Sequence, residues 1–210
     1  MNKELETRAY GAEFGFGDDS EGTIIEGMPI VFNSRTNIGY FDEVIESGAL
    51  NNADLTDVRL CLNHDTSYVY ARSRRNNPNS TMQLAVTEEG LKISAKLDTE
   101  SSERAKDFVS MIKRGDIDKM SFMFSIDEDR WEDLESDHPT RHILKIGSVV
   151  EVSAVTFPAY DTTEINARSK EALDNARSAV DTARQQNAKA VETANELELA
   201  KAKFNFTNRL

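Results

Sequence analysis

The chain has 210 residues, of which 37 are acidic and 25 basic, and a formal net charge of −12 at neutral pH. This acid excess argues against a nucleic-acid partner, because affinity for phosphates comes largely from Lys and Arg. The single cysteine, Cys61, excludes an internal disulfide and is typical of a reducing compartment. The sequence has neither an apolar signal peptide nor a run of about 18 apolar residues, so we expect an intracellular protein that does not bind membranes.

The first half of the chain has the alternating pattern of short β-strands. Segments 4–14 and 22–32 predict two strands, joined by the turn-rich segment GFGDDSEG. The segment YFDEVIESGAL predicts a short element of one helical turn. Four further strands are expected, at 57–65, 68–75, 81–90 and 91–98.

The second half begins with a change to helical periodicity. Its apolar residues recur at spacings of three and four: Ala105, Phe108, Val109 and Ile112. Asp98 or Thr99 is the expected N-cap of this helix, and Gly115 is the expected stop. A strand follows from Lys119, and after a polar loop at 127–140 one or two more strands lead to Pro158. These elements predict an α+β fold, a β-rich, barrel-like domain with packed helices.

A boundary is expected near residue 168, with a body at 1–168 and a tail at 169–210. The tail lacks Pro and Gly, and good helix formers dominate it, so we expect a long C-terminal helix. Its small apolar positions have a heptad-like spacing, with one polar member: Leu173, Ala176, Val180, Ala183, Asn187, Ala190, Ala194 and Leu197. The pattern predicts either a solvated single helix or a helix that pairs with a copy of itself or with a helical partner.

Three polar residues interrupt apolar strands and are the candidates for chemistry. Ser121 lies in KMSFMFSI, where Met120, Phe122 and Phe124 alternate onto the other face. His64 continues the inward face of Val58, Leu60 and Leu62 at the end of its strand. Glu151 is expected to share a face with Val149, Ser153 and Val155. A serine, a histidine and a carboxylate are the residue types of serine nucleophile catalysis, although each also has a plain structural explanation.

Other chemistry has little support. The histidines His64, His138 and His142 lack the spacing of a zinc site, and the only cysteine is remote, so no metal and no cofactor are expected. Cys61 is expected on the face of its strand opposite to that of Val58 and Leu60, and we interpret it as a small packed side chain. No basic neighbour is evident that would generate its thiolate.

The order of short motifs resembles the prohead (procapsid) maturation proteases of tailed bacteriophages, which are related in fold to the herpesvirus assembly protease, assemblin. The similarity covers nearly all of residues 7–168. The motifs that carry it are GMPIVFNS, YFDEVIESGAL, VRLCLNHD, GLKISAKLD, IKRGDIDKMSFMFSI and VVEVSAVTFPAYDTTEINAR.

The resemblance implies a serine endopeptidase. Ser121 matches the nucleophile of the family and His64 its general base. Glu151 is the expected third member, with His142 a weaker alternative, because the herpesvirus relatives use a second histidine. Arg130 and Arg141, which flank the acidic loop, compete with backbone N–H groups as oxyanion donors.

The resemblance also implies the biological setting. The expected partners are the major capsid protein and its scaffold region, together with the protease itself as a substrate. The expected location is the host cytoplasm, inside the immature procapsid. The alternative is a catalytically silent assembly or scaffolding component, in which Ser121 only packs.

Overall fold

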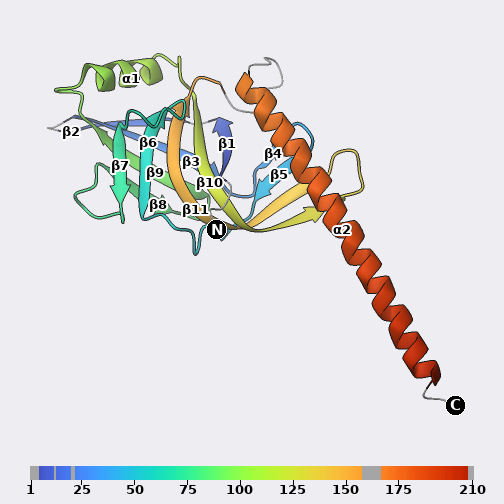
Figure 1. Cartoon of the computed structure of the whole chain (residues 1–210). Helices are drawn as coiled ribbons and strands as arrows, with labels where there is room; N and C mark the ends of the chain where they lie inside the picture. Colours follow the sequence, from blue (N-terminus) through green and yellow to red (C-terminus); the bar gives the residue numbers. More distant parts are fainter. Residues whose placement is uncertain (1–4, 12, 20–21, 158–166, 208–210) are drawn as a thin grey trace.

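The computed structural model describes residues 5–11, 13–19, 22–157 and 167–207, and shows a strand-rich body with a short helix and a long C-terminal helix (Figure 1). The strands are β1 (Glu6–Gly11), β2 (Gly15–Asp19), β3 (Gly22–Val31), β4 (Arg35–Asn37), β5 (Asp42–Ile45), β6 (Asp57–Leu62), β7 (Ala71–Arg74), β8 (Met82–Val86), β9 (Gly90–Leu97), β10 (Lys119–Glu132) and β11 (Thr140–Val155). The helices are α1 (Glu103–Lys113) and α2 (Ala167–Thr207). The predicted α+β class and the long C-terminal helix are confirmed.

The described strands form two sheets that do not close into a true barrel, an arrangement that is compatible with the predicted β-rich, barrel-like class. One sheet has the order β2-β3-β9-β8. The other has the order β1-β10-β11-β5-β4, and β11 also pairs with β6, which pairs with β7. The long β11 strand therefore has β5 beside its first residues and β6 beside its last, both in parallel register.

One hydrophobic core joins the two sheets and α1. Its largest buried members come from both sheets and from the helix: Ile25, Leu60, Leu91, Phe108, Phe122 and Phe124. Burial of this apolar area is the main stabilising contribution to such a fold. The core anchors β10 through alternate residues, which leaves the intervening residues on the opposite face of that strand.

Helix α1 contains the predicted apolar face, with Ala105, Phe108, Val109 and Ile112 buried. Its N-cap differs from the prediction: the hydroxyl of Ser102, rather than Asp98 or Thr99, accepts a hydrogen bond from the Ala105 N–H. Gly115 ends the helix as predicted, with a positive φ of 79° that glycine adopts without strain.

Three other predicted elements differ from the structure. The GFGDDSEG segment contains strand β2, which pairs with β3, while β1 pairs with β10. The segment at 40–50 contains strand β5 rather than a helical turn at its centre. The acidic loop is shorter than predicted because β10 and β11 continue as a hairpin to Glu132 and Thr140. Pro158, the expected end of the last strand, lies outside the described residues.

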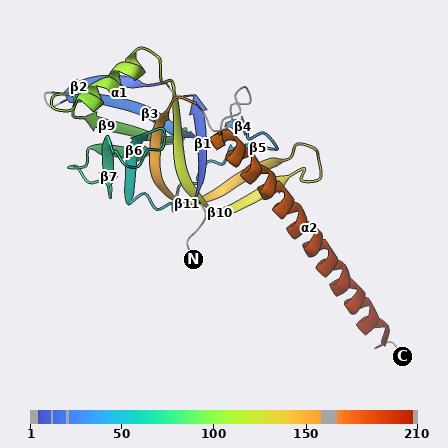
Figure 2. The same ribbon diagram turned by 45° about the horizontal axis from the view of Figure 1, so that its top comes forward.

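Helix α2 crosses the body near β4 and β5, and its C-terminal half extends away from it (Figures 1 and 2). Ala176 and Val180 of the predicted seam pack on Ile38, Phe41 and Trp131 of the body. These two seam residues are therefore covered by the body of the same chain and not by a second helix. Further along, the Asn187 side chain donates to Glu135 Oε1 (3.4 Å), and the Arg184 guanidinium donates to the carbonyls of Leu134 and Ser136. The side chain of Leu173 lies outside the described part of the chain.

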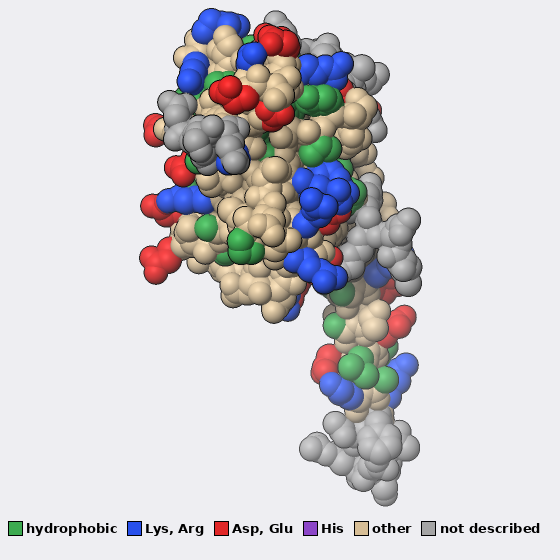
Figure 3. Space-filling model, turned by 90° about the vertical axis from the view of Figure 1, so that its left-hand side faces the viewer, with side chains coloured by type: hydrophobic (Ala, Val, Ile, Leu, Met, Phe, Trp, Pro, Cys, Tyr) green, Lys and Arg blue, Asp and Glu red, His purple; other side chains and the backbone are tan. Residues whose placement is uncertain are grey.

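Acidic and basic side chains are interspersed over the face of the body shown in Figure 3, and hydrophobic side chains are few there. Within the described residues, neither helix has a stretch long and apolar enough to cross a lipid bilayer.

Candidate active site

Ser121 lies on β10, between β1 on one side and β11 on the other. It is directly opposite Ala9 of β1 and Ser153 of β11. Its neighbours Met120 and Phe122 are in the core, which fixes the strand and turns Ser121 to the other face. The Ser121 side chain is 1% exposed, and its hydroxyl donates to the main-chain carbonyl of Arg8 (2.7 Å).

His64 follows β6 in a turn with left-handed backbone. Asn63 has a φ of 53° and His64 a φ of 61°, values that are strained for residues other than glycine. The turn is attached to β11, because the Asn63 N–H donates to the Ala154 carbonyl (3.0 Å) and the His64 N–H to Ser153 Oγ (3.0 Å). The turn breaks the alternation of β6, so the prediction that His64 continues the inward face of Val58 is wrong.

Glu151 reaches the same place from β11. It is opposite Met123 of β10 and beside Arg59 of β6. The register between β10 and β11 shifts at this point: Met123 pairs with Glu151, but the next residue, Phe124, pairs with Val149. The one extra residue in β11 changes the face of the sheet to which the later side chains of this strand point. Val149 therefore belongs to the core while Glu151 lies on the face of Ser153, so the prediction that Val149 shares the face of Glu151 is wrong.

The structure joins His64 and Glu151 directly. His64 Nδ1 lies 2.7 Å from Glu151 Oε2, and Glu151 is only 2% exposed. For a neutral imidazole beside an ionised carboxylate, which can only accept, this bond assigns the proton to Nδ1 and leaves a lone pair on Nε2, as a general base needs. Among the described residues, no hydrogen bond occupies Nε2.

Ser121 is one strand away from this pair. Its opposite residue, Ser153, receives the His64 N–H, and directly opposed residues of antiparallel strands have Cα atoms about 5 Å apart. The Ser121 hydroxyl donates to Arg8 rather than to the imidazole. A proton transfer from Ser121 to His64 would require this bond to Arg8 to break first.

Cys61 lies on the same face, beside Ser153. Burial raises the pKa of its thiol to about 12, with a further contribution from the negative charge of Glu151. The thiolate, which is the nucleophilic form, is thus strongly disfavoured at neutral pH.

His142, the alternative third member, is not brought to Ser121. It pairs with β5 near the start of β11, nine residues before Glu151. Its Nδ1 bonds to Glu46 (2.6 Å) and its Nε2 to Glu132 (3.0 Å), so both ring nitrogens are occupied.

Arg130 and Arg141, the two expected oxyanion donors, lie near His142 at the turn end of the β10–β11 hairpin. Arg141 is bonded to Asp129 (2.6 Å) and Glu6 (3.2 Å). The negative charges of Glu6, Glu43 and Asp129 overcome the effect of burial and raise the pKa of Arg141. The structure does not bring either arginine to Ser121.

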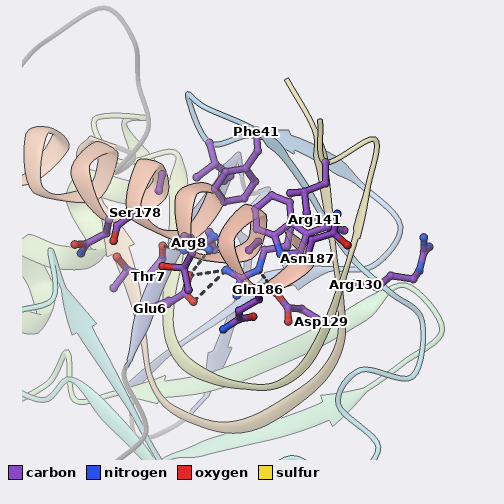
Figure 4. A pocket seen from close by; sticks show the side chains of 18 of the residues that line it. Glu6, Thr7, Arg8, Phe41, Asp129, Arg130, Arg141, Ser178, Gln186 and Asn187 are labelled. Carbon is purple, nitrogen blue, oxygen red and sulfur yellow. Dashed lines mark hydrogen bonds and ion pairs between the residues drawn. The ribbon is translucent and has the colours of Figure 1, made fainter. Parts of the chain in front are cut away.

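A cavity of about 740 Å³ lies between α2 and the strands β1, β10 and β11, away from the His64–Glu151 pair. Glu6, Arg8 and Arg141 point toward one another in it (Figure 4). Arg8 is also paired with the fully buried Glu43, to which its Nη2 donates (2.7 Å). These contacts fix β1, and with it the Arg8 carbonyl that holds Ser121. We assign no ligand to this cavity because four of its charged side chains, Glu6, Arg8, Asp129 and Arg141, pair with one another.

The described ranges contain no group of three or more His, Cys, Asp or Glu side chains that is arranged to hold a metal ion. The chemistry available on this face of the sheet is that of a hydroxyl, an imidazole and a carboxylate. A serine on the strand beside a histidine–carboxylate pair provides the residue types of a serine hydrolase site, although the Ser121 hydroxyl is bonded to Arg8 and not to the imidazole.

Comparison with known sequences identifies the family of serine hydrolases to which the chain belongs. The sequence model of the caudovirus prohead serine protease family matches residues 4–178, and the chain belongs to this family of serine proteases, which act in capsid maturation. Among solved structures, the chain is similar to the bacteriophage T4 capsid assembly protease, gp21, with 12% sequence identity and a TM-score of 0.41 over 75% of this chain and 100% of that chain. The chain has no significant match among curated protein sequences.

Ser153 and Arg8 are contacts of the site that sequence reasoning missed as functional residues. Ser153 had a usable signal, because it lies two residues after Glu151 and both are polar in the otherwise apolar segment 149–155. Arg8 had none, because its role at Ser121 is carried by the backbone carbonyl and depends on the remote pairing of β1 with β10.

Proposed function

We propose that the chain is the endopeptidase of procapsid maturation, with Ser121 as nucleophile, His64 as general base and Glu151 as the group that orients the base. The observation that supports these roles is the His64 Nδ1–Glu151 Oε2 contact of 2.7 Å, on the strand next to Ser121. Its substrates are the scaffold region of the major capsid protein, or a separate scaffold protein, and the protease itself.

The proposed reaction is an acyl transfer in two steps. Ser121 Oγ attacks the carbonyl carbon of the scissile peptide while its proton moves to His64 Nε2. The tetrahedral intermediate collapses, the C–N bond breaks, and the imidazolium gives its proton to the leaving amine. A water molecule, deprotonated by His64, then attacks the ester, and the carboxyl product leaves as Ser121 recovers its proton. Glu151 stabilises the imidazolium that forms in both steps.

The proposed setting is the interior of the immature procapsid, in the host cytoplasm. There α2 has a role that its shape supports: its first turns are attached to the body, and its second half projects outward, with Val191, Leu197 and Leu199 more than half exposed. We propose that this projecting half holds the protease among helical scaffold segments, or against a second copy of itself, until cleavage releases it.

Replacing Ser121 with alanine is expected to abolish processing when the protease is expressed together with its capsid protein. Gel analysis and intact-mass measurement should show full-length capsid protein and full-length protease, because the other site residues cannot form the acyl-enzyme.

Ser125→Ala is the matched control. Ser125 is also buried on β10, four residues further on, but its hydroxyl bonds to Ser148 Oγ (3.0 Å) and not to the proposed site. This variant should process capsid protein at the wild-type rate. Continued processing by Ser121→Ala would refute the nucleophile, and an unprocessed capsid protein in the wild type would favour a silent assembly component.

A further inference from the structure

We propose that Ser153 is a positioning residue that sets the geometry of both His64 and Glu151, an inference that rests on the proposed function. Its hydroxyl accepts from the His64 backbone N–H (3.0 Å) and donates to Glu151 Oε1. Its side chain thus hydrogen-bonds to both members of the pair, and it is fully buried. It lies directly opposite Ser121, so one residue connects all three positions.

The two bonds of Ser153 have different effects. The bond to Glu151 occupies Oε1, which leaves Oε2 to receive the His64 Nδ1–H and fixes the rotation of the carboxylate. The bond from the His64 N–H holds a left-handed turn, a strained backbone that persists only where surrounding contacts determine it. Asn63 is held separately, because its Oδ1 accepts from the Thr156 N–H (2.9 Å).

Ser153 is not placed to serve as the nucleophile itself. Its hydroxyl has one proton, which is donated to Glu151, and one of its lone pairs is occupied by the His64 N–H. It acts on the reaction only through the position of the imidazole and the tautomer that Glu151 selects.

Ser153→Ala should lower kcat while KM stays unchanged, because the imidazole and carboxylate lose their fixed positions and the substrate-binding surface does not change. A displacement of about 1 Å in a catalytic group costs on the order of 10²-fold in rate. A conservative Ser153→Thr change keeps the hydroxyl and should restore most of the rate, provided that the added methyl is accommodated.

The test combines two measurements on the full chain. The first is the rate at which diisopropyl fluorophosphate modifies Ser121, where Oγ bonds to phosphorus and fluoride leaves. The second is the NMR signal of the His64 Nδ1–H proton, assigned by its loss in His64→Ala, since His138 and His142 also bond to carboxylates. Ser153→Ala should slow modification on the order of 10²-fold and shift or broaden this signal. Ser125→Ala should change neither.

The outcomes separate the two proposals. If Ser153→Ala folds and matches Ser125→Ala in both measurements, Ser153 is merely structural and the inference is wrong. If the wild type is never modified at Ser121 but Ser153→Ala still loses the imidazole signal, the positioning holds and the proposed function fails. If Ser153→Ala does not fold, Ser153→Thr takes its place: a retained imidazole signal supports the inference, and a lost signal despite a retained fold contradicts it.

Discussion

Replacing His64 with alanine is expected to lower kcat/KM for peptide cleavage by about 10²–10⁴-fold, the usual contribution of one positioned general base. His64 Nε2 is the proposed general base, because Nδ1 is bonded to Glu151. The fold should be retained, since the buried Glu151 keeps its bond to Ser153. Initial rates on a peptide from the capsid scaffold junction, at several pH values, would measure the loss.

Two comparisons make this prediction specific. Glu151→Gln should cost less than His64→Ala, because the imidazole remains while the group that fixes its tautomer is weakened. The double variant Ser121→Ala/His64→Ala should be no worse than Ser121→Ala alone, because residues that act as a unit are not additive. Additive losses would contradict a shared step, and a His64→Ala enzyme with wild-type kcat/KM would remove His64 from the mechanism.

Glu43→Gln is expected to lower the free energy of unfolding by about 3–5 kcal/mol, the range for breaking a buried ion pair by removing one partner. Glu43 is fully buried between two guanidinium groups: Arg8 Nη2 donates to its Oε2 at 2.7 Å, and Arg141 Nη1 lies at 3.8 Å from the same oxygen. The change removes the fully buried carboxylate from the Arg8 pair, so that Arg8 retains the partly exposed Glu6 as a counter-charge. Urea unfolding, followed by circular dichroism, would measure it.

Arg35→Gln provides the control on the neighbouring strand. Arg35 pairs with Asp42 at 3.2 Å, but its side chain is 60% exposed, so its loss should cost no more than about 1 kcal/mol. If both variants lost the same free energy of unfolding, the burial of the ion-pair cluster of Arg8, Arg141, Glu6 and Glu43 would not control stability.

The same cluster gives the stability a pH dependence. Burial alone would raise the pKa of the Glu6 carboxyl, but the positive charges of Arg8 and Arg141 hold it below its ordinary value. A carboxyl whose folded-state pKa is lowered stabilises the fold above its unfolded pKa. This contribution is lost as the pH falls through the lowered value.

The sequence identified the main elements and the three chemically distinctive residues because both depend on local patterns. Alternation predicted β10 and the exceptional position of Ser121, and helical spacing predicted α1 with its four buried residues. Glu151 was evident as a carboxylate in an apolar strand. These features follow from the preference of apolar side chains for the core, which a short window of sequence already displays.

The geometry of the site was less predictable because it depends on breaks in that pattern. Asn63 and His64, the two residues after β6, have left-handed backbone. Extending the alternation of β6 to His64 therefore assigned its side chain to the wrong face of the sheet. The register shift beside Phe124 separates Glu151 from Val149 in the same way. A turn or a bulge adds one residue to the count, and one residue reverses every later side chain.

Contacts between segments that are far apart in the chain could not be predicted from the sequence. The pairing of β1 with β10 joins residues more than 100 positions apart, and it gives Ser121 its bond to Arg8. Likewise, a heptad-like seam does not say which surface covers it. In the structure, the body of the same chain covers Ala176 and Val180.

Mapping the adduct of diisopropyl fluorophosphate by peptide mass spectrometry tests the central claim most directly. We expect one modified residue, Ser121, in the wild type, with no modification at Ser125 or Ser153 and a much slower reaction in His64→Ala. Modification of another serine with Ser121 unmodified, or an equal rate in His64→Ala, would contradict the assignment of Ser121 and His64 as nucleophile and base.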